Sequence, residues 1–158
     1  TAAAGDVDDL TLLDRRSFAL ELAITRRQFR YLMRSPSATV RVIRRERRVV
    51  ASIVILRQRT HRGVLARLYS LAVDRDFRGR GLGLAVTVDM LDLLREEGIA
   101  AVILEVEAEN TAAMRLYEKL GFLKTRQLID YYGAGRHGWK MRLDLVTAKL
   151  PALAGGQA

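Results

Sequence analysis

Apolar and polar positions follow two different periods along this chain, and these periods divide it into helices and strands. Segments with apolar residues at helical spacing alternate with β-rich or continuous apolar runs. The expected helices are residues 6–18, 25–35, 81–97 and 110–120. The expected strands are residues 39–44, 49–56, 64–73, 100–106, 122–130 and 139–144. This order predicts a mixed α/β protein with helices packed on a central sheet.

Residues suited to helix ends support these boundaries. Thr25 and Asn110 stand where an N-terminal capping side chain is expected, and Gly98 and Gly121 follow two of the predicted helices. Residues 100–106 are almost continuously apolar, which is typical of a strand that is buried on both faces.

Length and composition indicate one globular domain, which we expect to cover residues 1–146, with a disordered tail at 147–158. No apolar run approaches the roughly 20 residues that span a bilayer, and no signal peptide is recognisable at the start of the sequence. We therefore expect a cytoplasmic protein without membrane contact. The chain has no cysteine, which excludes a disulfide or a thiol nucleophile, and His61 and His137 lack a ligand-like spacing. We expect no metal.

The net charge of +9 comes almost entirely from arginine. This charge has two interpretations: a surface that attracts phosphate, nucleic acid or an acidic partner, or an ordinary solvated basic face. The sequence lacks the interleaved aromatic residues of a stacking platform, so we expect no direct nucleic-acid binding.

A glycine-rich segment separates the strand 64–73 from the following helix. It reads Arg78-Gly79-Arg80-Gly81-Leu82-Gly83. A glycine turn before a helix exposes backbone N–H groups, and together with the helix dipole they form a site for phosphate. The segment lacks the lysine and hydroxyl residue of a P-loop, and its glycine spacing differs from the dinucleotide fingerprint. A purely structural loop is the remaining alternative.

The segment resembles the R/Q-x-x-G-x-G/A signature of the GNAT acetyltransferases, matched by Arg78, Gly81 and Gly83. Residues 68–73 look like the fourth strand of that family, and residues 104–122 are similar to its fifth strand and following helix. The latter block resembles the branch that acetylates protein N-terminal amines, typified by bacterial ribosomal-protein alanine acetyltransferases. The similarity covers about residues 39–145.

This resemblance implies the GNAT fold, with helices on both faces of a mixed sheet that is splayed between the family's fourth and fifth strands. It also implies acetyl-CoA as cosubstrate. The backbone of Leu71, Ala72 and Val73 would bind the pantetheine arm, and residues 78–83 would bind the pyrophosphate. Asn110 would contact the arm in addition to capping its helix.

Two residues are candidates for acid–base chemistry. Glu105 interrupts an apolar strand, so partial burial should raise its pKa towards that of a general base. The alternative is a strand-end glutamate that faces solvent or pairs with an arginine. Tyr117 lies at helical spacing between Met114 and Leu120, as a core tyrosine would. The resemblance gives Glu105 the role of base through water and Tyr117 the role of acid.

The resemblance also bears on the acceptor. Paired tyrosines like Tyr131 and Tyr132 line the amine entrance in the N-terminal acetyltransferase branch, although an exposed hairpin pair is equally compatible with the sequence. Beyond them, Arg136 and His137 depart from the branch and suggest a cationic rim that would favour an acidic peptide. The expected acceptor is a peptide or protein α-amine, and a ribosome-associated protein is one candidate. The alternatives are a small-molecule amine, a lysine side chain, or a non-catalytic acyl-CoA-binding module.

Overall fold

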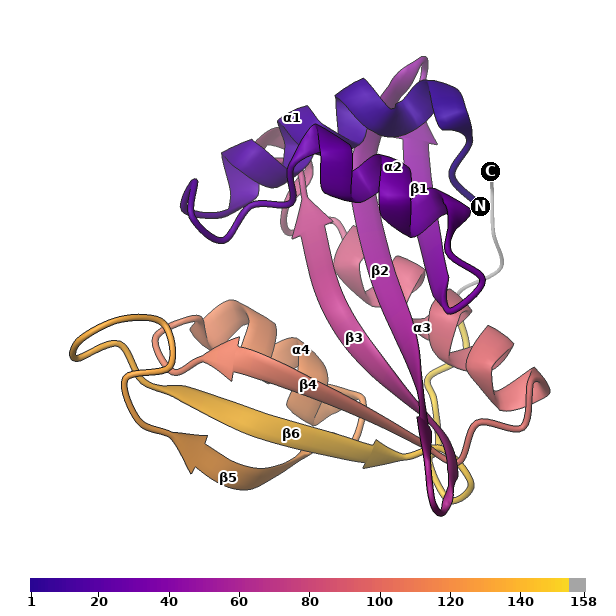
Figure 1. Cartoon of the computed structure of the whole chain (residues 1–158), viewed down its shortest axis with the longest axis vertical. Coiled ribbons are helices and arrows are strands. Elements are labelled where there is room, and N and C mark those ends of the chain that lie inside the picture. Colours follow the sequence, from indigo (N-terminus) through magenta and orange to yellow (C-terminus); the bar gives the residue numbers. More distant parts are fainter. Residues whose placement is uncertain (154–158) are drawn as a thin grey trace. The chain divides into compact units, whose positions relative to one another are not determined.

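The computed structural model describes residues 1–153 and contains four α-helices, two short 3₁₀ helices and six strands within that range (Figure 1). The helices are η1 (Ala4–Asp6), α1 (Val7–Ser17), α2 (Arg26–Arg34), η2 (Arg75–Phe77), α3 (Leu82–Glu96) and α4 (Thr111–Lys119). The strands are β1 (Ala38–Arg45), β2 (Arg48–Thr60), β3 (Gly63–Val73), β4 (Ala101–Glu107), β5 (Leu123–Leu128) and β6 (Gly138–Asp144). Within the expected tail 147–158, residues 154–158 lie outside the described residues.

The strands form one sheet in the order β1-β2-β3-β4-β6-β5. β3 and β4 run parallel, with Arg67 opposite Ile103, whereas β4 and β6 run antiparallel, with Glu105 opposite Lys140. The expected mixed α/β architecture is thereby confirmed. The splay between β3 and β4 stays a prediction.

The expected elements are all present, and β2 differs most from its predicted length. It continues four residues beyond residue 56 to Thr60, through a polar stretch without an apolar alternation to reveal it. The hairpin turn that joins it to β3 contains Gly63, whose φ of +115° favours glycine. The Thr25 hydroxyl accepts the N–H of Gln28 and begins α2 as predicted.

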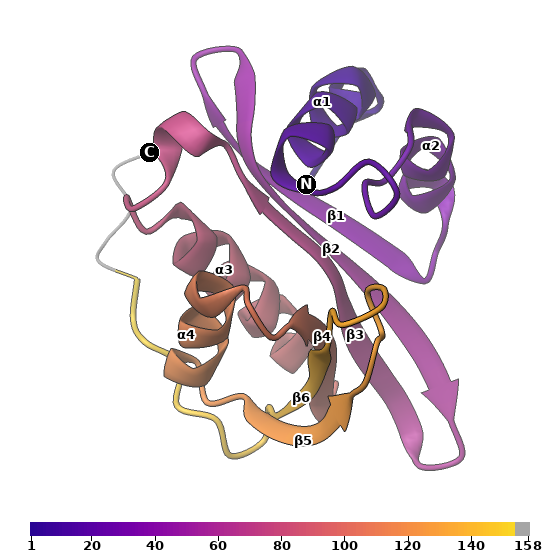
Figure 2. The same ribbon diagram turned by 90° about the vertical axis from the view of Figure 1, so that its left-hand side faces the viewer.

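The chain divides into two compact units, and unit 1 comprises Thr1–Arg57 and Tyr69–Met90. Here α1 and α2 lie side by side against β1 and β2 (Figures 1 and 2). Phe29 of α2 and Leu10 of α1 are completely buried in a cluster with apolar residues of the strands. A separate cluster packs Leu82, the first residue of α3, against Val50 and Ala51 of β2.

Unit 2 comprises Gln58–Leu68 and the described part of Leu91–Ala158. Here α4 lies along one face of β4, β6 and β5 (Figure 2). The Arg95 guanidinium donates to the carbonyl oxygens of Leu145 and Ala148 at 3.2 and 2.7 Å, which holds the chain after β6 against the end of α3. None of the helices within residues 1–153 is long and apolar enough to span a membrane.

A buried carboxylate joins three segments of unit 1. Asp14 of α1 is 1% exposed, and its side chain accepts the N–H of Ile24 and the hydroxyl of Ser70 in β3. Burial raises the pKa of Asp14 to about 6, although both hydrogen bonds oppose the rise. Asp14 therefore holds the α1–α2 connection against β3 at the cost of desolvating a carboxylate.

We predict that Asp14 makes the fold less stable as the pH rises. Between about pH 4 and 6 the folded protein keeps a proton on Asp14 that the unfolded chain has released, so stability falls with pH in this window. The free energies of unfolding of wild type and Asp14→Asn, measured in urea, should be compared at several pH values. Their difference should change by up to about 3 kcal/mol between pH 4 and 7. The other carboxylates are common to both proteins, so a difference independent of pH would contradict this assignment.

Candidate active site

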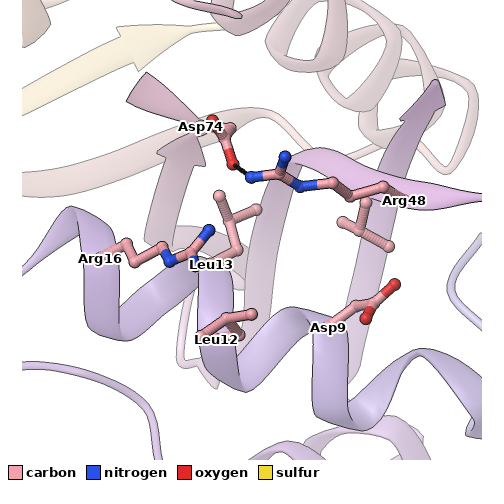
Figure 3. Close-up of a pocket in the computed structure, with 7 residues that line it drawn as sticks. Asp9, Leu12, Leu13, Arg16, Arg48 and Asp74 are labelled. Carbon is pink, nitrogen blue, oxygen red and sulfur yellow. Dashed lines mark hydrogen bonds and ion pairs between the residues drawn. The ribbon is translucent and has the colours of Figure 1, made fainter. Parts of the chain in front are cut away.

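In unit 1, β3 ends at Val73, and η2 leads from there to the glycine-rich segment. Asp74 fixes the end of β3. Its N–H donates to the Val50 carbonyl at 2.8 Å, and its carboxylate accepts the N–H of Asp76 at 3.0 Å. The same carboxylate is 6% exposed and pairs with Arg48, as Figure 3 shows. Arg16 of α1 lines the same small hollow (Figure 3). Asp74 thus anchors the start of the segment to β2.

The backbone favours glycine at two positions of this segment. Gly79 and Gly81 have φ of +72° and +75°, and a Cβ atom at either position would meet no atom within 4 Å. The Gly81 carbonyl accepts the N–H of Ala85 at 2.9 Å, which makes Gly81 the N-cap residue of α3. Because glycine has no capping side chain, the N–H groups of Leu82 and Gly83 remain available to an anion.

The side chains around the segment add positive charge. Arg78 is exposed and its Nε donates to the Val73 carbonyl at 3.2 Å, while the Arg80 guanidinium lies 5.2 Å from the centre of the Phe77 ring. The Leu82 side chain is buried in the core, so only its backbone can face a ligand. Phosphate binding by residues 78–83 stays a prediction.

The three strand residues that precede the segment differ in burial. Ala72 is 1% exposed, whereas Leu71 and Val73 are half-buried. Their expected backbone contacts with a pantetheine arm stay a prediction.

In unit 2, Glu105 is held by an arginine from the neighbouring strand. The Arg67 Nε lies 2.9 Å from Glu105 Oε2, and the two side chains are only 27% and 16% exposed. Arg67 of β3 lies opposite Ile103 of β4. Arg67 is therefore on the same face of the sheet as Glu105. The alternative of a glutamate paired with an arginine is thus observed. The Arg67 guanidinium thus fixes the position of the Glu105 carboxylate.

Tyr117 is buried on α4, with 6% of its surface exposed, and its ring packs edge-on against Phe122 at 5.6 Å. Burial, with a smaller effect from Tyr132, raises the pKa of Tyr117 well above its ordinary value. The phenol therefore stays protonated at neutral pH and can donate. Asn110 caps α4 as predicted, with its side-chain oxygen accepting the N–H of Ala113 at 3.2 Å.

Tyr132 is half-buried, whereas its neighbour Tyr131 is 51% exposed. Burial raises the pKa of Tyr132, with smaller contributions from Tyr131 and from the negative charges of Glu105 and Glu107. The Tyr132 phenol therefore stays protonated at neutral pH.

Gly138 of β6 makes room for the Tyr132 ring. A Cβ atom there would lie 2.6 Å from a Tyr132 ring carbon and 2.8 Å from the Val106 carbonyl oxygen. Only a glycine lets the ring lie directly on the strand, next to the end of β4. Neither this contact nor the role of Arg67 was visible in the sequence, because both depend on strand register.

The cationic rim expected at Arg136 and His137 is compensated by carboxylates. Arg136 donates Nε and Nη2 to the two carboxylate oxygens of Glu107 at 2.9 and 3.1 Å. His137 Nδ1 accepts the N–H of Asp130 at 3.0 Å and lies 3.6 Å from its carboxylate. The rim is therefore not a source of free positive charge. Within residues 1–153, no three His, Cys, Asp or Glu side chains gather as a metal site.

Comparison with known proteins identifies the class that this arrangement belongs to. Residues 7–122 match the acetyltransferase (GNAT) family, and the chain belongs to that family. It is 37% identical over 89 residues to N-alpha-acetyltransferase 30 of Schizosaccharomyces pombe, covering 55% of this chain and 59% of that protein. It is 43% identical over 67 residues to the [ribosomal protein bS18]-alanine N-acetyltransferase of Escherichia coli K12, covering 42% and 45%.

The chain spans about half the length of these curated relatives. Among solved structures, it is similar to the ribosomal-protein-S18-alanine N-acetyltransferase of Escherichia coli, with a TM-score of 0.78 and 24% identity. That match covers 100% of this chain and 96% of the solved chain. At this level of identity the similarity shows the fold alone. It confirms the fold class expected from the sequence.

Proposed function

We propose that this chain is an acetyl-CoA-dependent N-acetyltransferase whose acceptor is the N-terminal α-amine of a peptide or protein. The observation that carries the proposal is the Arg67–Glu105 ion pair, which holds a shielded carboxylate on β4, together with the buried Tyr117 on α4, whose phenol stays protonated. Family membership supports the reaction, and the names of the two relatives support the kind of acceptor. A cytoplasmic reaction on a ribosomal or newly made protein fits this chemistry.

The glycine-rich segment would hold the phosphates of the cosubstrate. Leu82 and Gly83 offer their backbone N–H groups at the positive end of the α3 dipole, and Arg78 and Arg80 neutralise charge nearby. The backbone of residues 71–73 would bind the pantetheine arm, and Asn110 would contact it. The exposed glycines leave space for a phosphate to approach the backbone closely.

Glu105 would act as general base, through a water molecule, on the protonated acceptor amine. The neutral amine then attacks the thioester carbonyl, and the tetrahedral intermediate collapses as Tyr117 donates its phenolic proton to the departing sulfur. The remaining proton on the adduct nitrogen passes through water to the Tyr117 phenolate, which restores the phenol. Arg67 is a positioning residue, since it holds the Glu105 carboxylate at 2.9 Å. Because the chain contains no cysteine, transfer is direct and passes through no thiol-bound acetyl group.

An α-amine suits a base of this kind better than a lysine side chain does. The α-amine has a pKa of about 7.7–8.0, roughly 2.5 units below that of lysine, so much more of it is neutral at pH 7. A single carboxylate such as Glu105 can therefore serve as the base. Tyr131 and Tyr132 would line the entrance for the amine.

We predict that a negative charge in the glycine-rich segment abolishes acetyl-CoA binding. The variant Gly81→Asp should fold, because a Cβ atom at Gly81 meets open space and aspartate tolerates a positive φ. Calorimetry should show no binding to Gly81→Asp. The variant Gly81→Asn has the same shape without the charge and should retain weakened binding. Unchanged affinity in a folded Gly81→Asp protein would show that the phosphates lie elsewhere.

We predict that Glu105→Gln lowers kcat by roughly 10² to 10⁴, the usual contribution of a general base, with acetyl-CoA affinity unchanged. The deficit should shrink at higher pH, where the amine is already neutral. Glu96→Gln is the matched control, since Glu96 is an exposed residue at the end of α3. A Glu105→Gln rate within a few-fold of wild type at every pH would make Glu105 structural.

The proposed acceptor is tested with two peptides of one sequence, one with a free N-terminus and one with a blocked N-terminus and an internal lysine. The free α-amine should be acetylated faster at pH 7, as followed by mass spectrometry. Faster reaction of the blocked peptide would move the chain to the lysine or small-amine class. Binding of acetyl-CoA without transfer to either peptide would favour a non-catalytic module.

A further inference from the structure

The sheet in unit 2 has one face covered by α4 and another with long basic side chains. On the covered face, Lys124 of β5 pairs with Glu118 of α4 at 3.7 Å and lies 5.0 Å from the Trp139 ring centre. On the other face, strand register places Arg126, Lys140 and Glu105 in one row across β5, β6 and β4. The adjacent row contains Arg142 opposite Ile103. Up to residue 153, no helix of unit 2 packs on this face (Figure 2).

Three of these residues, Arg126, Lys140 and Arg142, form what we term the cationic sheet face. Arg126 and Arg142 are exposed and Lys140 is half-buried. Within residues 1–153, none of the three has a carboxylate partner, unlike Arg67, which pairs with Glu105. Side chains directly opposite one another on neighbouring strands lie about 5 Å apart at Cβ, so the three charges form one patch.

The cationic sheet face begins beside the candidate base. Lys140 is the direct cross-strand neighbour of Glu105, about 5 Å away, and Arg126 lies one strand further, at about 10 Å. An extended peptide advances about 3.3 Å per residue and directs every second side chain to the same side. A peptide with its α-amine at Glu105 can therefore bring its second to fourth side chains over Lys140 and Arg126.

We propose that the cationic sheet face binds acidic side chains in the residues that follow the α-amine of the acceptor. This inference rests on the proposed function and narrows the acceptor to proteins with acidic N-terminal segments. Charge complementarity favours such a segment, and the same patch repels a basic one, which gives discrimination in both directions. The sequence suggested a preference for acidic peptides from Arg136 and His137, whose charges are compensated by carboxylates. The cationic sheet face would now account for that preference.

The test uses peptides that share their first residue and carry glutamate or glutamine at positions two to four. Wild type should show a kcat/KM about tenfold higher for the acidic peptide, since exposed charge pairs each contribute about 0.2–1 kcal/mol. Replacing both arginines, Arg126→Gln with Arg142→Gln, should reduce this ratio towards one. Charge reversal with Arg126→Glu leaves the patch with the same net charge as the double-glutamine variant and should reduce the ratio to a similar extent, and the preference of wild type should weaken in high salt.

The control is Arg115→Gln, which removes an exposed arginine from α4 on the opposite side of the sheet and should leave the ratio unchanged. Equal rates for the two peptides in wild type would overturn the inference while leaving the proposed function intact. Failure to acetylate either peptide would instead count against the proposed function.

Fluorescence anisotropy adds a readout without catalysis. If labelled single-stranded RNA binds and loses affinity in the double-glutamine variant while the acidic peptide does not bind, the face serves nucleic acid and the inference is wrong.

Discussion

The ion pair between Arg67 and Glu105 is the interaction on which the candidate site depends. It joins β3 to β4 within unit 2 and places a carboxylate on a strand whose other central residues are apolar. Both side chains are largely shielded from water, so each charge needs the other. Removing one partner would leave a poorly solvated charge behind, which costs far more than the loss of an exposed pair. The orientation of Glu105 is therefore a consequence of the sheet's register.

The other groups of the site are arranged around this pair by packing. The packing of α4 against the sheet buries Tyr117. The Tyr132 ring packs against β6 because Gly138 lacks a side chain. Burial keeps both phenols protonated, while the ion pair with Arg67 fixes the position of Glu105.

Much of the fold could be predicted from local patterns, because helix caps and apolar periodicity act over a few residues. Thr25 and Asn110 begin α2 and α4, and the apolar run at 101–106 became the buried strand β4. The end of β2 was missed because its last residues are polar, and a hairpin rather than burial extends it. Asp14 was also missed, although a carboxylate four residues after Leu10 on an apolar helix stripe is a signal of a buried anchor.

The candidate site residues could be selected from the sequence, whereas their charged partners could not. Glu105, Tyr117 and the glycine-rich segment stood out by position in recognisable strands and turns. Their partners could not be read in the same way, since Arg67 lies 38 residues before Glu105 and Arg136 lies 29 residues after Glu107. Strand register brings such residues together. The same limit made Arg136 look like free positive charge when Glu107 already neutralises it.

A double-mutant cycle between Arg67 and Glu105 tests the central claim, that Arg67 acts on catalysis through Glu105. The rate kcat would be measured for wild type, Arg67→Met, Glu105→Gln and the double variant, with acetyl-CoA affinity and folding followed in parallel. If the claim is right, Arg67→Met lowers kcat in wild type and has almost no further effect once Glu105 is glutamine. If the two substitutions instead lower kcat independently, so that their effects multiply, the pair does not work as a unit and the account is wrong.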